Sequence, residues 1–194
     1  CALPISQIIL ASASPRRAEL LSQIGVRYRV EVADIEEVVG DETPQQAVVR
    51  LATEKAQHIQ GQQEKTILPI LGADTIVVHR EEVLQKPTCR ADGLEMLSRL
   101  SGETHQVMSA VTVVSEQGVQ QILNCSEITF RTITEIEREA YWDHGESSDK
   151  AGGYAVQGMA AIFIANLKGS YSGVMGLPLF ETAQLLRETG VKLL

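Results

Sequence analysis

The sequence predicts a mixed-sheet α/β fold. Apolar runs typical of buried strands alternate along the chain with segments of helical periodicity, and this alternation favours a sheet with helices packed against it. Two long β-runs, at 106–114 and 120–130, are separated only by a turn at Glu116-Gln117-Gly118, so a hairpin must also be part of the sheet. At 194 residues we expect a single domain over residues 1–194, built in three layers, that could form two lobes around a cleft.

The first strand, loop and helix carry an unusual pair of charges. Residues 8–10 predict a buried strand, and after a stretch of small residues Ser14 suits a helix N-cap and Pro15 the first helical position. Arg16 and Arg17 follow in the first turn, where the helix dipole makes a cation unfavourable by about a few tenths of a kcal/mol. A bound anion would reverse that sign. An anion site and plain solvent exposure are equally good interpretations of these arginines taken by themselves.

A lysine lies on the apolar side of the second predicted helix. After a strand at 28–32, the capping box Thr43-Pro44-Gln45-Gln46 begins this helix. Its apolar stripe consists of Val48, Leu51, Ala52, Ala56 and Ile59. Lys55 falls on the same stripe, so its ammonium group either extends to solvent or serves a site.

A carboxylate lies within the most apolar part of the chain. Residues 67–78 predict a buried strand, interrupted at 72–75 by Gly-Ala-Asp-Thr. Burying an ionised group without a partner costs several kcal/mol, so Asp74 must be paired, hydrogen-bonded or functional. The small residues Gly72 and Ala73 would leave room for a ligand, and a structural aspartate at a bulge is the alternative.

The rest of the chain continues the alternation of helices and strands. We expect a turn at 79–82, a return strand at 83–84, helices at 91–100, 134–142 and 179–189, and a strand at 162–167. The polar, glycine-rich stretch 146–158 is too long for a simple turn and is a candidate functional loop. It contains Lys150 beside glycines, and Gln157, whose amide could bind the edge of a base.

Composition excludes several classes of protein. The chain is 44% hydrophobic and 22% charged, and charged or amide residues interrupt every apolar run before it reaches a membrane-spanning length. The net charge of −8 and the dispersed basic residues argue against stable nucleic-acid binding. Cys1, Cys89 and Cys125 form no zinc pattern and no disulfide framework, and residues 1–7 lack the pattern of a signal peptide. We therefore expect a cytoplasmic protein without membrane contact.

The chemical residues together suggest metal-assisted phosphoryl chemistry. Arginines and lysines suit phosphates, and carboxylates suit a hard cation and an attacking water. Glu37 and Lys86 could belong to such a set, although an acidic cluster is usually a solvated loop and a lysine before proline is usually in a surface turn. The chain has neither Walker nor Rossmann glycine spacing, its four histidines share no ligand spacing, and no Ser-His-Asp or Cys-His arrangement is evident.

Six sequence blocks, in order along nearly the whole chain, carry a specific resemblance. They are Leu10-Ala11-Ser12-Ala13-Ser14-Pro15-Arg16-Arg17, Glu54-Lys55-Ala56, Gly72-Ala73-Asp74-Thr75, Lys86-Pro87, Asp149-Lys150-Ala151-Gly152-Gly153-Tyr154 with Gln157-Gly158, and Gly176-Leu177-Pro178. Each is weak by itself, but the ordered set resembles the Maf family of nucleoside triphosphate pyrophosphatases.

This resemblance implies a fold and an activity. The fold would be an elongated mixed-sheet α/β structure with a central cleft, similar to that of the inosine triphosphatases. The activity would be metal-dependent hydrolysis of a nucleoside triphosphate to its monophosphate and pyrophosphate. Asp74 matches the proton acceptor, and Arg16, Thr75 and Gln157 match positions that set base specificity. Glu37, Lys55 and Lys86 match conserved polar residues of the family's site, and the residues at 73–75 and 157 resemble the branch that prefers dTTP and UTP.

Residues and resemblance together lead to one mechanistic hypothesis. Glu37, with or without Asp74, would hold Mg²⁺ or Mn²⁺, and Asp74 would activate a water for attack on the α-phosphorus. Arg16, Lys55 and Lys86 would neutralise the departing pyrophosphate. The substrate-binding set is Ser12, Ser14, Arg16, Arg17, Thr75, Lys150 and Gln157.

The sequence is also compatible with other functions. A nucleotide-binding regulator of cell division without significant catalysis is one alternative. A different phosphate hydrolase, such as a phosphomonoesterase, would need a nucleophile or a second metal cluster that the sequence does not show. Modified pyrimidine nucleotides could also be substrates, and exposed sheet edges would permit a homodimer.

Overall fold

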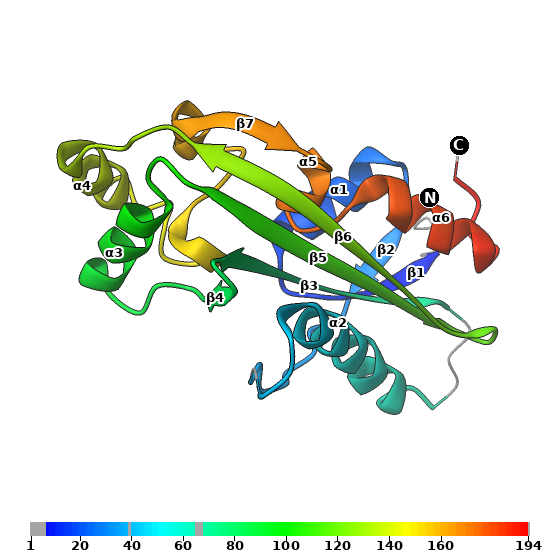
Figure 1. The fold of residues 1–194 in the computed structure, drawn as a ribbon. Helices are drawn as coiled ribbons and strands as arrows, with labels where there is room; N and C mark the ends of the chain where they lie inside the picture. Colours follow the sequence, from blue (N-terminus) through cyan, green and yellow to red (C-terminus); the bar gives the residue numbers. More distant parts are fainter. Residues whose placement is uncertain (1–6, 39, 65–67, 194) are drawn as a thin grey trace. The chain divides into compact units, whose positions relative to one another are not determined.

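A mixed sheet organises the chain, as predicted. The computed structural model describes residues 7–38, 40–64 and 68–193. Over these residues seven strands form one sheet in the order β2-β1-β3-β5-β6-β7, with β4 paired to β3 (Figure 1). The strands are β1 (Ile8–Ala11), β2 (Tyr28–Val30), β3 (Ile70–His79), β4 (Glu82–Leu84), β5 (Thr104–Ser115), β6 (Gly118–Phe130) and β7 (Ile164–Lys168). The β1 strand is parallel to β2 and β3, whereas the β3–β4 and β6–β7 pairs are antiparallel.

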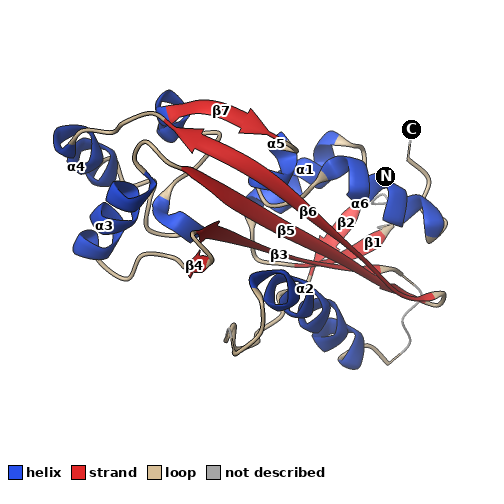
Figure 2. Cartoon of the chain, in the orientation of Figure 1, coloured by secondary structure: helices blue, strands red, loops and turns tan. Residues whose placement is uncertain are grey.

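Helices connect these strands (Figure 2). They are α1 (Pro15–Gln23), α2 (Pro44–Gly61), α3 (Arg90–Leu100), α4 (Glu135–Asp143), α5 (Tyr171–Val174) and α6 (Leu179–Glu188), with 3₁₀ helices η1 (Ala151–Gly153) and η2 (Met159–Phe163). Among the described residues, no helix is both long and apolar enough to cross a membrane.

The chain divides into two compact units. The first comprises Cys1–Asp74, Ser109–Asn124 and Gly176–Leu194, and the second comprises Thr75–Met108 and Cys125–Met175. The strands β3, β5 and β6 each contribute residues to both units.

The first unit has its core between α2 and the strands β1 and β3. Its buried cluster consists of Ile9, Ala11, Ala56, Ile59, Ile70 and Val114. The predicted capping box begins α2: the Thr43 hydroxyl accepts from the Gln46 amide at 3.3 Å, and the Gln46 side chain accepts from the Thr43 amide at 3.0 Å. All five residues of the predicted stripe are buried, and so is Lys55. The pattern of the helix therefore identified the face that packs against the sheet.

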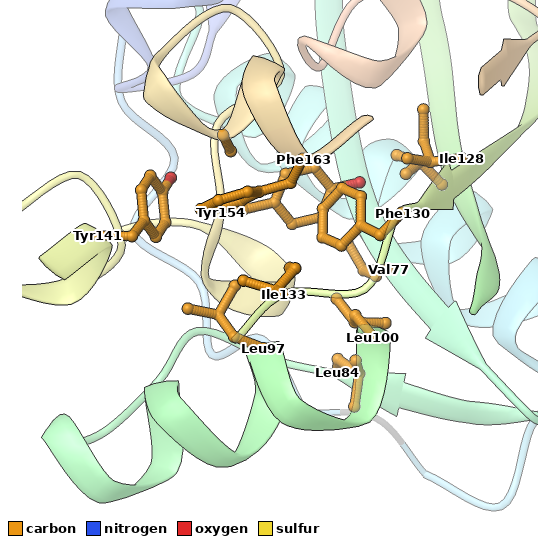
Figure 3. Packing of buried hydrophobic residues seen from close by; sticks show 12 residues of the cluster. Val77, Leu84, Leu97, Leu100, Ile128, Phe130, Ile133, Tyr141, Tyr154 and Phe163 are labelled. Carbon is orange, nitrogen blue, oxygen red and sulfur yellow. The ribbon is translucent and has the colours of Figure 1, made fainter. Parts of the chain in front are cut away.

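The second unit is centred on aromatic residues (Figure 3). The ring of Phe130 lies 4.9 Å from that of Tyr154 and 6.3 Å from that of Phe163, in edge-on geometry. The Tyr154 hydroxyl is 2.7 Å from Nε2 of the buried His105. Tyr154 belongs to one of the sequence blocks noted above, and the structure shows that it is a core residue.

Several local expectations were wrong at their edges. The strand predicted at 28–32 ends at Val30, and β7 begins only at Ile164 because the preceding residues form η2. The strand predicted at 67–78 is described from Ile70, residue 67 lies outside the described residues, and β3 runs through 72–75 without the expected interruption. Ser14 is the N-cap of α1, but its side chain makes no capping hydrogen bond.

Candidate active site

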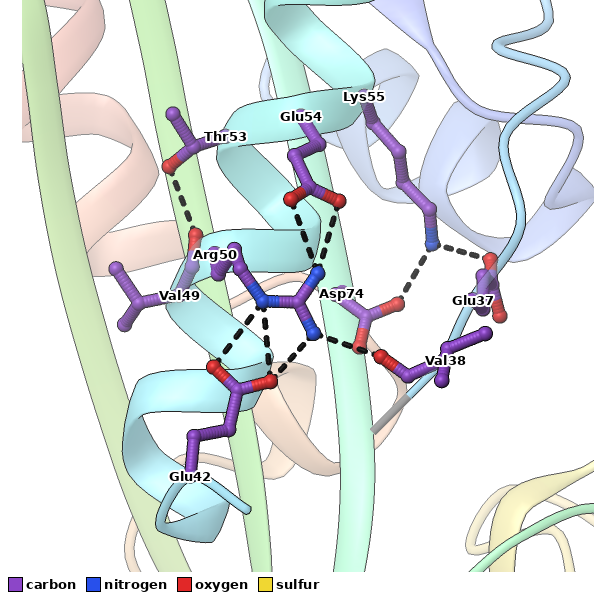
Figure 4. A network of polar contacts seen from close by, with 9 residues as sticks. All are labelled: Glu37, Val38, Glu42, Val49, Arg50, Thr53, Glu54, Lys55 and Asp74. Carbon is purple, nitrogen blue, oxygen red and sulfur yellow. Dashed lines mark hydrogen bonds and ion pairs between the residues drawn. The ribbon is translucent and has the colours of Figure 1, made fainter. Parts of the chain in front are cut away.

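Two carboxylates meet at one ammonium group in the first unit. Nζ of Lys55 lies 2.6 Å from Oδ1 of Asp74 and 2.6 Å from Oε1 of Glu37 (Figure 4). Lys55 and Asp74 are 7% and 6% exposed, whereas the Glu37 side chain is 46% exposed. Asp74 therefore has the partner that a buried carboxylate requires, and the Lys55 ammonium group is paired with carboxylates instead of extending to solvent.

The close approach of β3 to α2 brings Lys55 to Asp74. A Cβ at Gly72 would lie 2.2 Å from the carbonyl oxygen of Ala52 and 2.8 Å from the amide nitrogen of Ala56. Residues two apart on a strand share a face, so Gly72 and Asp74 both face α2. The space beside Gly72, expected to accommodate a ligand, is instead filled by the backbone of the helix.

Arg17 joins the charge cluster from α1. Its Nε donates to the carbonyl of Gly176 at 2.9 Å, and its Nη1 donates to Oγ of Ser12 at 3.1 Å. Burial lowers the pKa of Arg17, while the nearby carboxylates of Asp74 and Glu37 oppose that shift and the charge of Arg16 adds to it. Two cations and two carboxylates thus interact in one unit.

The start of α1 is arranged differently from a simple N-cap. The amide of Ser14 donates to Oγ of Ser12 at 3.2 Å, so the same buried hydroxyl accepts from both Ser14 and Arg17. Arg16 is half-buried. Arg17 therefore binds the loop before α1 through Ser12 and a distant segment through the carbonyl of Gly176.

The second unit contains the other predicted site residues. Thr75 follows Asp74 on β3 and is half-buried, and Lys86 is exposed just after β4. The amide of Gly152 donates to the carbonyl of Gln85 at 3.0 Å, which attaches the glycine-rich loop to the residue before Lys86. Gly152 has φ +70°, and a Cβ there would lie 3.0 Å from the side chain of Val77. Since Thr75 and Val77 share a face of the strand, the loop packs on the face of β3 to which Thr75 points.

Glu146 anchors that loop at both ends. Its carboxylate accepts from the amide of Met159 at 3.0 Å and from the hydroxyl of Tyr141 at 3.1 Å. The Tyr141 hydroxyl in turn accepts from the amide of Ala155 at 3.1 Å. A Cβ at Gly158 would lie 2.2 Å from the Glu146 carboxylate, so a side chain at this position would displace that carboxylate from its partners.

The predicted loop residues lie on this anchored segment. Nζ of Lys150 donates to the carbonyl of Glu146 at 3.0 Å and pairs with Asp149, and Gln157 is exposed. The sequence singled out Lys150 and Gln157 but not Glu146 or Tyr141. Glu146 and Tyr141 are identified only by their tertiary contacts, Glu146 with Gly158 and Tyr141 with Ala155. Neither composition nor spacing reveals such contacts.

No set of three or more His, Cys, Asp or Glu side chains able to hold a metal occurs in the described part of the chain. The described cysteines, Cys89 and Cys125, are exposed and form no disulfide, and Cys1 lies outside the described residues.

Comparison with known proteins identifies the family of this chain. Residues 7–189 match the family described as Maf-like protein. A dTTP/UTP pyrophosphatase from Alkalilimnicola ehrlichii is 52% identical over 93% of this chain and 92% of its own length, and one from Cupriavidus pinatubonensis is 48% identical over 95% and 98%. Among solved structures, a nucleoside-triphosphatase and dITP/XTP pyrophosphatase from Mycobacterium abscessus matches 63% of this chain and 73% of its own, with a TM-score of 0.42 and 18% identity. On the family match and these identities, the chain belongs to the Maf family.

Proposed function

We propose that this protein hydrolyses dTTP and UTP to the nucleoside monophosphate and pyrophosphate. The observation that carries the proposal is the pair of carboxylates, Glu37 and Asp74, held on either side of the Lys55 ammonium group. The names of relatives about half identical over more than nine-tenths of the chain support the substrate class.

The carboxylate pair fits a divalent cation. Nζ of Lys55 lies 2.6 Å from an oxygen of each carboxylate, so the two side chains are close enough to share one cation, which would displace the ammonium group from Glu37. Mg²⁺ is usually held by one or two carboxylates together with substrate phosphates and water, and does not need a cage of three protein ligands. Glu37 and Asp74 would hold Mg²⁺ or Mn²⁺, which when bound would polarise the phosphate groups.

The residues of the chain would share the remaining work. Asp74 would accept a proton from the water whose oxygen attacks the α-phosphorus, while the bond from that phosphorus to the bridging oxygen breaks and pyrophosphate leaves. Lys55 holds the Asp74 carboxylate in place by their ion pair. Arg16, Arg17 and Lys86 would bind the phosphates, because guanidinium and ammonium groups neutralise the charge that builds on the leaving pyrophosphate.

The starts of α1 and of the loop would complete the substrate contacts. Ser12 and Ser14 would offer donors at the N-terminal end of α1, where an anion is favourable. Thr75 and Gln157 would recognise the pyrimidine edge, and Lys150 would add a positive charge from the anchored loop. Modified pyrimidine nucleotides that keep the same edge would also be accepted.

The decisive experiment measures pyrophosphate release from a panel of nucleoside triphosphates, with Mg²⁺, with Mn²⁺ and with chelator. We expect metal-dependent release from dTTP and UTP, with the monophosphate as the second product. A preference for purines would contradict the base assignment but keep the chemistry. Absence of release from every nucleotide would overturn the proposal and favour a nucleotide-binding regulator.

A further inference from the structure

The guanidinium group of Arg50, on α2, binds three different partners (Figure 4). Its Nε donates to both carboxylate oxygens of Glu42 at 3.0 and 3.1 Å, and its Nη2 donates to Glu42 as well. Its Nη1 donates to the carboxylate of Glu54 at 3.0 and 2.9 Å. Its Nη2 also donates to the carbonyl of Val38 at 2.7 Å.

Only an arginine can make this set of bonds. The planar guanidinium presents donors on three nitrogens in a fixed fork, whereas a lysine offers one nitrogen. The hydrogen bonds that Arg50 donates to Glu42 and Glu54 raise its pKa, so the group stays charged throughout the usual pH range.

These bonds fix the chain next to Glu37. Val38 directly follows Glu37, and Glu42 directly precedes Thr43, the N-cap of α2. Between β2 and α2 the described residues form no helix or strand, and the Glu37 side chain is 46% exposed. Neither a backbone ladder nor burial therefore sets the position of Glu37, and the Lys55 ion pair and the Arg50 bond to the neighbouring carbonyl are two contacts that contribute to it.

We propose that Arg50 is a positioning residue that holds the Glu37 carboxylate opposite Asp74 by fixing the backbone at Val38 onto α2. Lys55 binds the Glu37 carboxylate and Arg50 binds the backbone carbonyl of Val38. Both side chains come from α2, so this segment is attached to one helix at two neighbouring points. Arg50 acts through Glu37 and contacts neither Lys55 nor Asp74 in any described hydrogen bond. The inference rests on the proposed function, because it assigns Glu37 to the cation.

The physical consequence is a metal site that is organised before the cation arrives. Without Arg50, Glu37 would retain its Lys55 partner. A cation must displace that partner, and the backbone at Val38 would then also lack its hydrogen bond to α2. Partners that orient metal ligands are worth about 10- to 100-fold in metal affinity or activity. We expect the loss to fall on metal affinity, because the described partners of Arg50 are Val38, Glu42 and Glu54, to which the proposed function assigns no contact with the nucleotide or the attacking water.

The test compares R50Q with the wild type and with R131Q. Arg131 is a matched control, since it binds Glu137 with two bonds at 2.7 and 3.1 Å in the second unit. With UTP as substrate, the measurement is the Mn²⁺ concentration for half-maximal pyrophosphate release, and kcat at saturating Mn²⁺. For R50Q we expect the Mn²⁺ constant to rise about 10- to 100-fold with kcat within about threefold of wild type, and for R131Q we expect both to be unchanged.

A second measurement does not depend on catalysis. Hydrogen exchange in the metal-free protein should be faster in R50Q for peptides covering residues 36–42, and unchanged in peptides of the second unit. If R50Q is too unstable at the assay temperature, R50K gives the same comparison, because lysine keeps the charge but cannot reach Val38, Glu42 and Glu54 together.

The outcomes separate the two proposals. An inactive wild type overturns the proposed function, whereas the exchange experiment still measures the tether. An unchanged Mn²⁺ constant in R50Q overturns the inference, as does a fall in kcat without a change in that constant, or an exchange pattern equal to wild type. In the E37Q background, where the proposed ligand is gone, adding R50Q should raise the Mn²⁺ constant less than twofold. An increase as large as in the wild-type background would also overturn the inference about Arg50.

Discussion

Oδ1 of Asp74 on β3 lies 2.6 Å from Nζ of Lys55 on α2, and both side chains are more than nine-tenths buried. The two residues are 19 positions apart in the sequence and belong to the same compact unit. Breaking a buried pair by removing one partner usually costs about 3–5 kcal/mol, because the other charge stays behind without compensation. We therefore expect the pair to contribute to stability, in addition to the catalytic role proposed for Asp74.

The first prediction separates these two roles at Asp74. D74N keeps the shape of the side chain, and Lys55 keeps Glu37 as a partner, but the proton acceptor is lost. We expect kcat for UTP to fall by about 10²- to 10⁴-fold, with nucleotide affinity changed much less. Steady-state kinetics and nucleotide titration check this, with D143N, at an exposed position on α4, as the control. Near-normal turnover in D74N would remove Asp74 from catalysis.

The second prediction concerns the close packing at Gly72. In G72A the new methyl group would meet the carbonyl of Ala52 at 2.2 Å, so α2 must move away from β3. We expect a loss of about 1–3 kcal/mol in unfolding free energy, together with reduced activity, because Lys55 moves with the helix. The matched control is G61A at the end of α2, where a Cβ meets nothing within 4 Å. Denaturant unfolding measures both, and equal stability of the two variants would contradict the packing argument.

The third prediction concerns base recognition. If Thr75 and Gln157 bind the pyrimidine edge, the double variant T75A/Q157A should lose discrimination, because the hydrogen-bonding groups that select the base are gone. We expect the ratio of kcat/KM for UTP over GTP to fall at least about tenfold. An unchanged ratio would show that the preference for a base comes from other residues.

The fourth prediction concerns the anchor of the glycine-rich loop. E146A removes the acceptor for the Met159 amide and for the Tyr141 hydroxyl, so the loop carrying Lys150 and Gln157 would adopt more conformations. If about a tenth of the molecules keep the binding conformation, KM for UTP rises about tenfold, with a smaller change in kcat. E139A, at a glutamate of α4 outside the loop, is the control. A fall in kcat without a change in KM would count against this role.

The fifth prediction concerns pH. Burial, with a contribution from the charge of His79, lowers the pKa of His105 to about 3, whereas a histidine in the unfolded chain titrates near 6.5. Between these values the unfolded chain binds the additional proton, so the free energy of unfolding falls as pH decreases, by up to about 1.4 kcal/mol per pH unit from this group.

Unfolding by urea at pH 7 and pH 5 tests this expectation. H105Q should be less stable than wild type at pH 7, because it loses the bond to Tyr154, but its stability should depend less on pH. H144Q, at the exposed end of α4, should keep the wild-type slope. The same pH slope in H105Q and wild type would contradict the assignment to His105.

The sequence by itself determined the features that depend on near neighbours. The capping box at Thr43 and the apolar stripe of α2 follow from contacts within one or two helical turns, so both could be predicted. The position of Lys55 on that stripe was also evident, whereas the sequence left open whether its ammonium group extends to solvent. The need for a partner at Asp74 also follows from the sequence, because an ionised group in an apolar strand is costly wherever the strand lies.

Only the tertiary structure decided which residues meet. Arg17 binds the carbonyl of Gly176, 159 positions away, and the space at Gly72 is filled by α2. Such contacts depend on how elements pack, and a strand pattern with a period of two residues does not indicate which helix will cover it. The fold class and the helix faces therefore came from local patterns, and the set of candidate site residues came from those patterns together with the family resemblance. The partners of Lys55, Arg17 and Arg50 came from packing between distant segments.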